Sequence, residues 1–221
     1  MEYGYLFLEG AVYTLAVGVV SLVIATVLGI VIALMKLSSL RSLQWAARFY
    51  TTVVRGVPDL VMMLLFFYGV QIIINNIIEV LELDIYILLN PFLAGVLAIG
   101  FIFGAYMAET FRGAILAISR NEIEAAHAYG LSGKVLFWRI IFPQLIRYGL
   151  SSFTNNWLVL LKTTSLVSVI GLNDMVRMAN VAASSTKQPF IFYSVVLVIF
   201  LIYTSVSLWG LNVLKKRYHF S

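Results

Sequence analysis

The stretch 124-EAAHAYG-130, followed by 140-IIFP-143, is a polar, helix-forming segment that interrupts long apolar runs. The surrounding region, 119–146, is too polar to span a membrane and too rich in Ala, Leu and Ile to be disordered. Gly130 and Gly133 predict that it breaks into two short helices. Such an island indicates a docking site, where small side chains let a short helix enter a groove of a soluble partner. An amphipathic helix lying at the membrane interface explains the pattern equally well.

The composition of the 221 residues indicates the environment of the chain. Hydrophobic residues make up 62% and charged residues 11%, against about 25% charged in typical soluble domains. Apolar runs of roughly 20 residues match the length that a helix needs to cross a bilayer, and the alternating pattern of a membrane barrel is absent. The sequence therefore predicts an all-α integral membrane protein.

Five apolar stretches with few charges are predicted to be transmembrane helices. A proline opens three of them, at a position where its missing N–H costs nothing. Gly18 and Gly29 mark points in the first where another helix can approach closely. The predicted spans are 10–35, 58 to about 78, 91 to about 117, about 148 to 171, and the stretch after Pro189 that ends before Lys215.

The basic residues predict the orientation, because Lys and Arg in short loops favour the cytoplasmic side. They concentrate in the first connection (Lys36, Arg41, Arg48 and Arg55), in the third connection and in the tail, whereas the charged residues of the second connection are all acidic. The N-terminus is therefore predicted outside and the C-terminus in the cytoplasm, with 1–221 forming a single transmembrane domain.

Several kinds of chemistry are disfavoured. The chain has no cysteine, hence no disulfide, thiolate metal site or cysteine nucleophile. His127 and His219 are far apart and lack ligand partners at a useful spacing, so no metal site is expected. No glycine-rich phosphate loop appears, so the chain is not expected to bind ATP itself or to be an enzyme. The basic loops need no nucleic acid to explain them.

Four motifs in order carry a family resemblance. The island closely resembles the EAA loop of permease subunits in ATP-binding-cassette (ABC) importers. The segment 55-RGVPDL-60 resembles the entry to the second span of polar amino acid permeases. The segments 105-AYMAETFRGA-114 and 161-LKTTSLVSVIG-171 look like parts of the third and fourth spans of that family. An isolated EAA is a weak signal, but four motifs in the right order over nearly the whole chain are specific.

The resemblance implies a type I importer (MetI-like) fold and a permease of the bacterial inner (plasma) membrane. Its partners would be two cytoplasmic ATPases that bind ATP and Mg, a second permease, homologous or identical, and an external solute-binding protein. The loop 119–146 would supply the coupling helix that sits in a groove of the ATPase. The residues assigned to coupling are Glu124, Ala125, Ala126, Ala128, Gly130, Leu131, Ile141 and Pro143.

Two departures from the family pattern bear on the substrate. Val57-Pro58-Asp59 stands where many members read Thr-Pro-Leu, and it resembles the branch that handles histidine, lysine, arginine, ornithine and opines. This branch implies a cationic amino acid as substrate. Thr163 stands where the fourth-span motif usually has an acidic residue, so a carboxylate that binds the substrate side chain is not carried over to that position.

Polar residues within the spans are the candidates for the substrate path. An intramembrane charge costs about 2.5–3.5 kcal/mol on insertion scales, so its presence indicates a function. Glu109 is hypothesised to add negative potential for a cationic substrate, and Lys162 to order the fourth span. Alternatively, Glu109 pairs with Arg112 or Arg55 and only ties helices together. Asn155, Asn156 and Thr163 recur at helical spacing and are predicted to share a face, which suits either lining or packing. The full set of candidates is Tyr68, Gln71, Tyr106, Glu109, Asn155, Asn156, Lys162, Thr163, Thr164 and Ser165.

Two other functional classes remain open. A channel or secondary transporter is expected to show internal repeats or broken spans, and the sequence has no convincing repeat. A membrane scaffold would not need polar faces in its fourth span. A requirement for a separate ATPase distinguishes the importer from both.

Overall fold

A computed structural model describes residues 2–83 and 85–218, with His219 outside the described part. Within these residues the chain is helical and contains no strand, which confirms the predicted all-α class. In chain order the elements are α1 (Glu2–Leu37), α2 (Arg41–Gly56), α3 (Asp59–Val80), α4 (Pro91–Leu116), α5 (Arg120–Ala128), α6 (Gly133–Leu136), the π-helix η1 (Phe137–Ile141), α7 (Phe142–Thr163), the 3-10 helix η2 (Thr164–Ser168), α8 (Met175–Thr186) and α9 (Pro189–Tyr218).

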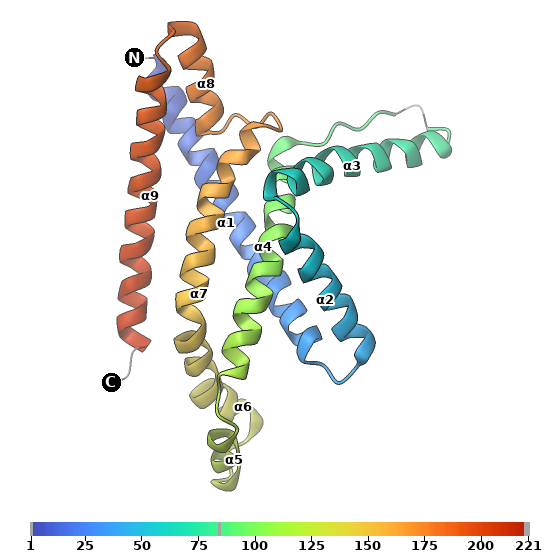
Figure 1. Ribbon diagram of the computed structural model, residues 1–221, viewed down its shortest axis with the longest axis vertical. Coiled ribbons are helices and arrows are strands. Elements are labelled where there is room, and N and C mark those ends of the chain that lie inside the picture. The colour runs from blue at the N-terminus through green and yellow to red at the C-terminus, as the bar shows by residue number, and fades with distance from the viewer. Residues whose placement is uncertain (1, 84, 219–221) are drawn as a thin grey trace.

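The centre of the molecule is a bundle in which α4 packs on α1 and α7, and α7 packs on α9 (Figure 1). Helices in a bilayer associate by close packing rather than by the hydrophobic effect, and glycine permits that here. A Cβ added at Gly29 of α1 would lie 2.5 Å from the Cβ of Met107 on α4, which confirms the predicted close approach. A Cβ at Gly18 would lie 3.6 Å from its nearest neighbours, which is ordinary contact.

In the described part of the chain, four helices are long and apolar enough to cross a membrane: α1, α3, α4 and α9. The three prolines that were predicted to open spans do lie at helix starts: α4 begins at Pro91, α9 at Pro189, and α3 directly after Pro58. The fourth predicted span corresponds to α7, whose 22 residues include polar ones that lower its hydropathy. It packs in the bundle between α4 and α9 and completes the set of five long helices (Figure 1).

The segment 41–80 departs from the prediction. The first connection was expected to be a cytoplasmic loop, but most of it forms α2, an amphipathic helix that buries Ala47, Thr51 and Val54. Val57, just before the proline, is extended (φ −102°, ψ 139°), because a residue that precedes proline disfavours the helical region. The break redirects the chain, so that α3 lies across the bundle instead of along it (Figure 1).

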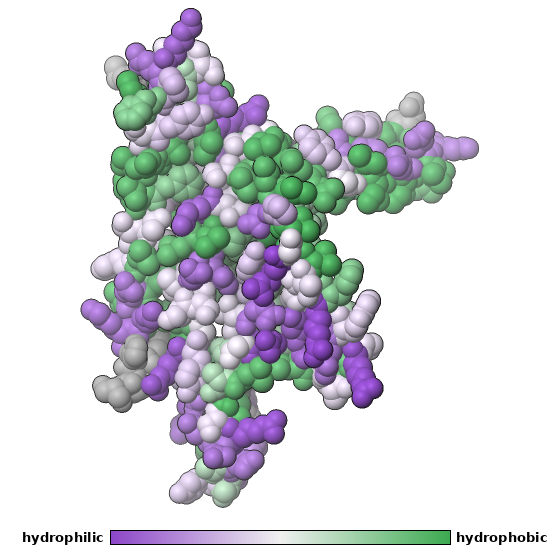
Figure 2. All heavy atoms as spheres, in the orientation of Figure 1, coloured by the Kyte–Doolittle hydropathy of each residue, from purple (hydrophilic) through white to green (hydrophobic). Residues whose placement is uncertain are grey.

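The two ends of the bundle carry different connections. The α1–α2 turn, the segment from α5 to η1, and the end of α9 lie at the lower end in Figure 1, while the start of α1 and α8 lie at the upper end. Figure 2 shows hydrophilic side chains at the upper tip, over α8, and at the lower tip, over α5. The α1–α2 turn thus lies at the same end as the third connection and the end of α9, whereas Arg55 lies in the last turn of α2, away from that end.

Candidate functional site

The predicted coupling segment projects beyond the lower end of the bundle (Figure 1). It forms two short helices, α5 and α6, as predicted from the two glycines. Gly130 has a φ of +73°, a left-handed conformation that costs glycine little and ends a helix naturally. The N–H of Gly130 donates to the carbonyl of His127 (2.9 Å), and the N–H of Leu131 donates to that of Ala126 (3.1 Å). These bonds reverse the chain, so that the start of α7 comes back over α5.

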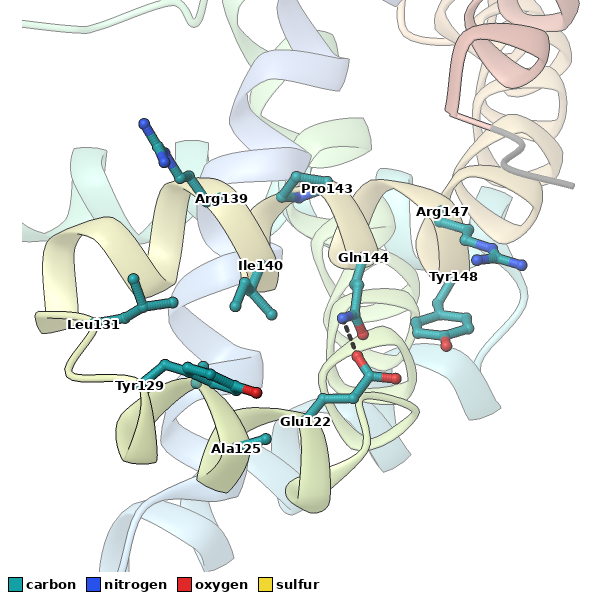
Figure 3. A pocket seen from close by; sticks show the side chains of 11 residues that line it. Glu122, Ala125, Tyr129, Leu131, Arg139, Ile140, Pro143, Gln144, Arg147 and Tyr148 are labelled. Atoms are coloured by element: carbon teal, nitrogen blue, oxygen red, sulfur yellow. Dashed lines mark hydrogen bonds between the residues drawn. The ribbon is translucent and has the colours of Figure 1, made fainter.

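A cavity of about 630 Å³ lies between α5 and the η1–α7 segment (Figure 3). Four of the predicted coupling residues line it: Ala125, Ala126, Leu131 and Pro143. Glu124, Ala128 and Gly130 are exposed, and Ile141 is half-buried; none of these four lines it. The remaining lining residues are Glu122, Tyr129, Arg139, Ile140, Gln144, Arg147 and Tyr148.

A polar contact holds the two walls of this cavity together. The side-chain amide of Gln144 on α7 donates to the carboxylate of Glu122 on α5 (Figure 3). The amide oxygen of Gln144 is buried and has no hydrogen-bond partner among the described residues. Glu122 and Gln144 were not predicted as site residues, and 22 positions separate them, so no local sequence pattern could have paired them.

The chain enters α7 through a π-helix. Its wider turn spans Phe137–Ile141, and the rings of Phe137, Trp138 and Phe142 pack on one another with centroids 5.0–6.1 Å apart. Single π-helical turns within α-helices often occur at functional sites. The aromatic cluster therefore packs η1 against the start of α7.

The polar residues of α7 separate into two groups. Asn156 points inward and donates to the hydroxyl of Thr110 on α4 (2.9 Å). The buried hydroxyls of Thr163, at the end of α7, and of Thr164, at the start of η2, both donate to backbone carbonyls of α7. Asn155 and Lys162 are exposed. The structure therefore does not place Asn155 on one face with Asn156 and Thr163. Ser165 is half-buried and donates to the carbonyl of Lys162 (2.7 Å).

Glu109 forms ion pairs with Lys36 on α1 and with Arg112, whose Nε lies 3.0 Å from its Oε2. Arg112 was one of the two expected partners. Arg55 was the other, but its guanidinium carbon instead lies 5.2 Å from the ring centroid of Tyr106. Lys36 was not foreseen, since it lies 73 residues away on another helix. The two cations neutralise Glu109, and the pair with Lys36 ties α1 to α4.

Tyr68 and Gln71, the remaining path candidates, lie elsewhere. They line a cavity of about 830 Å³ on α3 and the segment that follows it. Gln71 donates to the hydroxyl of Tyr86 (3.4 Å), and the amide of Asn75 bonds both the N–H and the carbonyl of Ile87. Within the described chain, the candidates on α3 and those on α7 do not form one site.

Two transport permeases are similar to this chain in sequence over most of its length. The sequence is 45% identical over 223 residues to the histidine/lysine/arginine/ornithine transport system permease protein HisQ of Escherichia coli (strain K12), covering 99% of this chain and 96% of that protein. It is 42% identical over 205 residues to the octopine transport system permease protein OccQ of Rhizobium radiobacter, covering 93% of this chain and 86% of that protein.

Solved structures agree in fold. The crystal structure of an amino acid ABC transporter with histidines superposes with a TM-score of 0.81 at 31% identity, covering 98% of this chain and 95% of that one. An inward-facing structure of the MetNI methionine ABC transporter gives a TM-score of 0.75 at 15% identity, over 98% and 97% of the two chains, which supports the fold alone. The type I importer fold expected from the sequence is thus confirmed.

The family match covers nearly the whole chain. Residues 5–217 match the family described as "Binding-protein-dependent transport system inner membrane component". Together with its apolar helices, this match makes the chain a multi-pass protein of the bacterial inner membrane. The chain therefore belongs to this family and is a transmembrane permease of the ABC importer type.

Proposed function

We propose that this permease imports a cationic amino acid, such as arginine, lysine, histidine, ornithine or an opine, using ATP hydrolysed by two partner ATPases. A second permease, identical or homologous, would complete the membrane unit, and an external solute-binding protein would deliver the substrate. ATP and Mg would be bound by the ATPases and not by this chain. Among the described residues, no group of three or more His, Cys, Asp and Glu could hold a metal ion.

The coupling role rests on the shape of the segment from α5 to η1. It projects from the bundle, and its exposed surface includes Glu124 and Ala128. A helix that projects in this way can enter a groove of the ATPase, while the Glu122–Gln144 contact and the aromatic cluster join it to α7. Closure of the ATPases on ATP would then move α5 and α7 together and shift the permease between its two states.

The orientation follows from this coupling. The ATPases act in the cytoplasm, so the end that holds α5, the α1–α2 turn and the end of α9 is the cytoplasmic end. This end also carries Lys215, Lys216 and Arg217 in the last turn of α9, as expected of a cytoplasmic segment.

The substrate path is proposed to run along the exposed face of α7. Ser152, Asn155 and Lys162 on this face are all exposed and are separated by three and seven positions, so they form one stripe. Polar residues in membrane helices usually face a partner or a water-filled cavity, and a second permease placed against α7 would create such a cavity. Thr163 and Thr164 are buried and act in packing.

The substrate class is supported by the relatives and by one motif. The Escherichia coli relative is named for histidine, lysine, arginine and ornithine, and the Rhizobium radiobacter relative for octopine. Val57-Pro58-Asp59 marks the same branch. Arg55 and Asp59, on either side of the α2–α3 break, both lie near the ring of Tyr106, where the path would pass.

Cysteine cross-linking tests the proposal, because the chain has no cysteine of its own. A cysteine at Ala128, exposed on α5, is expected to link to groove cysteines of the cognate ATPase, with a yield that changes when ATP and Mg are added. A cysteine at Ser184, exposed on α8 at the opposite end, is the matched control and is expected to give no link.

Uptake of labelled arginine by the assembled complex in vesicles tests the substrate class. Arginine uptake that requires ATP, with no uptake of glutamate, is the expected result. Flux that needs no ATPase would instead identify a channel or secondary transporter. A folded complex with neither link nor flux would identify a scaffold.

A further inference from the structure

A second cavity near the cytoplasmic end has a different chemical character from the coupling cavity. It measures about 480 Å³ and lies among α1, α4, α7 and α9, with Leu34, Ile115, Gly149 and Leu214 as lining residues from these four helices. Its lining is apolar throughout, and its size falls within the range of about 300–1,000 Å³ typical of small-molecule sites. An apolar cavity of this kind does not hold water well, so it suits a hydrocarbon chain.

Basic residues directly follow the α9 residue that lines this cavity. Leu214 lines the cavity, and the next three residues are Lys215, Lys216 and Arg217. The sequence has no acidic residue after Asp174, and within the described residues the only ion pairs are those of Glu109. Among the residues that the structure describes, these three cations therefore have no carboxylate partner. Figure 2 shows hydrophilic side chains at the lower left, where α9 ends.

A tryptophan marks the depth of this site in the bilayer. Trp209 is 72% exposed and lines a shallow pocket with Asn212, Lys215 and Lys216. Exposed tryptophans of membrane helices lie at the level of the lipid headgroups, with basic residues just beyond them. The lower end of α9 is therefore placed at the headgroup layer, and the apolar cavity lies at the depth of the acyl chains.

We propose that this cavity binds one acyl chain of an anionic phospholipid, whose phosphate is held by Lys215 and Arg217, the two basic residues on either side of Leu214 around the helix. Basic pockets between membrane helices on the cytoplasmic side bind anionic headgroups, and one such lipid would fill the cavity and neutralise the cations. A second copy of this chain fits less well, because its cytoplasmic segments are themselves basic and the whole chain carries a net charge of +5.

The position of the lipid connects it to the coupling segment. Phe137 and Phe142, from the aromatic cluster at the start of α7, both line this cavity. An acyl chain packed against these rings would brace the base of the coupling segment from the membrane side. The lipid would therefore support the helix junction that passes movement from α5 to α7.

Native mass spectrometry of the purified permease complex tests this inference. The complex is titrated with phosphatidylglycerol or with phosphatidylcholine of the same acyl chains. The wild type is expected to retain phosphatidylglycerol at least about tenfold more tightly. K215Q/R217Q is expected to lose this preference, whereas R41Q/R48Q, which removes two exposed charges from α2 at the same end, is expected to keep it.

A second pair of variants tests the acyl-chain cavity. Leu34→Trp narrows it and is expected to lower retention of both lipids at least about fivefold. Val31→Trp, on the same helix but outside the lining, is expected to bind as the wild type does. Equal retention of the two lipids by the wild type, or an unchanged preference in K215Q/R217Q, would overturn the proposal. Retention by the isolated chain but not by the complex would overturn it too, because a partner protein would then cover the cavity.

Discussion

Glu109 shows how one carboxylate can join two helices inside a membrane protein. Removing its charge leaves Lys36, whose side chain is only 9% exposed, without a partner. Breaking a buried pair by removing one member costs about 3–5 kcal/mol, and the 24% exposure of Glu109 reduces this. We expect Glu109→Gln to destabilise the permease by about 1–3 kcal/mol, measured as a lower thermal unfolding midpoint in detergent.

The double variant Glu109→Gln/Lys36→Met separates the structural role from a role in transport. A purely structural pair predicts that both stability and uptake recover in the double variant. If Glu109 also adds negative potential for a cationic substrate, stability recovers but uptake does not. An unchanged unfolding midpoint in Glu109→Gln would contradict the structural role.

Asp174 supplies a second prediction for a single residue. It lies between η2 and α8, fully buried, and accepts hydrogen bonds from the N–H groups of Val176 (3.2 Å) and Arg177 (3.0 Å). Burial raises the pKa of Asp174 from 3.8 to about 6, against the opposing effect of these hydrogen bonds. Between these two pH values the folded state holds a proton that the unfolded state lacks, so stability falls as the pH rises through this window.

Asp174→Asn removes this titration and keeps an acceptor at the helix start, where asparagine is also favoured. We expect the difference in unfolding midpoint, variant minus wild type, to become more positive between pH 5 and pH 8. A difference that stays constant over this range would contradict the raised pKa.

The contact between α1 and α4 depends on the absence of a side chain at one position. Gly29→Ala would place a Cβ 2.5 Å from the Cβ of Met107 and 3.0 Å from its carbonyl carbon, so the two helices must move apart. Overpacking of this kind costs about 1–3 kcal/mol, and we expect a lower unfolding midpoint. Gly210→Ala on α9, with no atom within 4 Å of the added Cβ, is the control and is expected to be neutral or slightly stabilising. Equal midpoints for the two variants would contradict this account.

The molecule as a whole leaves most of α3 uncovered, and the proposed second permease would cover it. Only 11% of the residues in the most apolar 18-residue stretch of α3 are buried, and the helix stands out from the bundle (Figure 1). A photoreactive side chain at Leu65 on α3, 61% exposed, is expected to cross-link to another permease chain. The same group at Val206 on α9, 62% exposed, is expected to react with lipid instead. Cross-linking to a permease from Val206 but not from Leu65 would show that a different face forms the interface.

The sequence by itself determined the five long helices, the starts of the three that follow or begin at a proline, and the polar island. Runs of apolar residues, the prolines at 58, 91 and 189, and Gly130 act over one or two helical turns, so their effects can be read locally. The same local patterns, taken as four motifs in order, were specific enough to indicate the family. They also predicted that the segment 119–146 does not span the membrane but serves as a docking site.

Only the tertiary structure decided which distant groups meet. Lys36 reaches Glu109 across 73 residues and Gln144 reaches Glu122 across 22, and neither pairing follows from spacing along one helix. The direction of α3 after Pro58, and the turning of Asn156 inward while Asn155 faces outward, depend on how α4 packs against its neighbours. Packing selects these arrangements because side chains that are far apart in sequence must fill the same space, and a local pattern carries no information about that space.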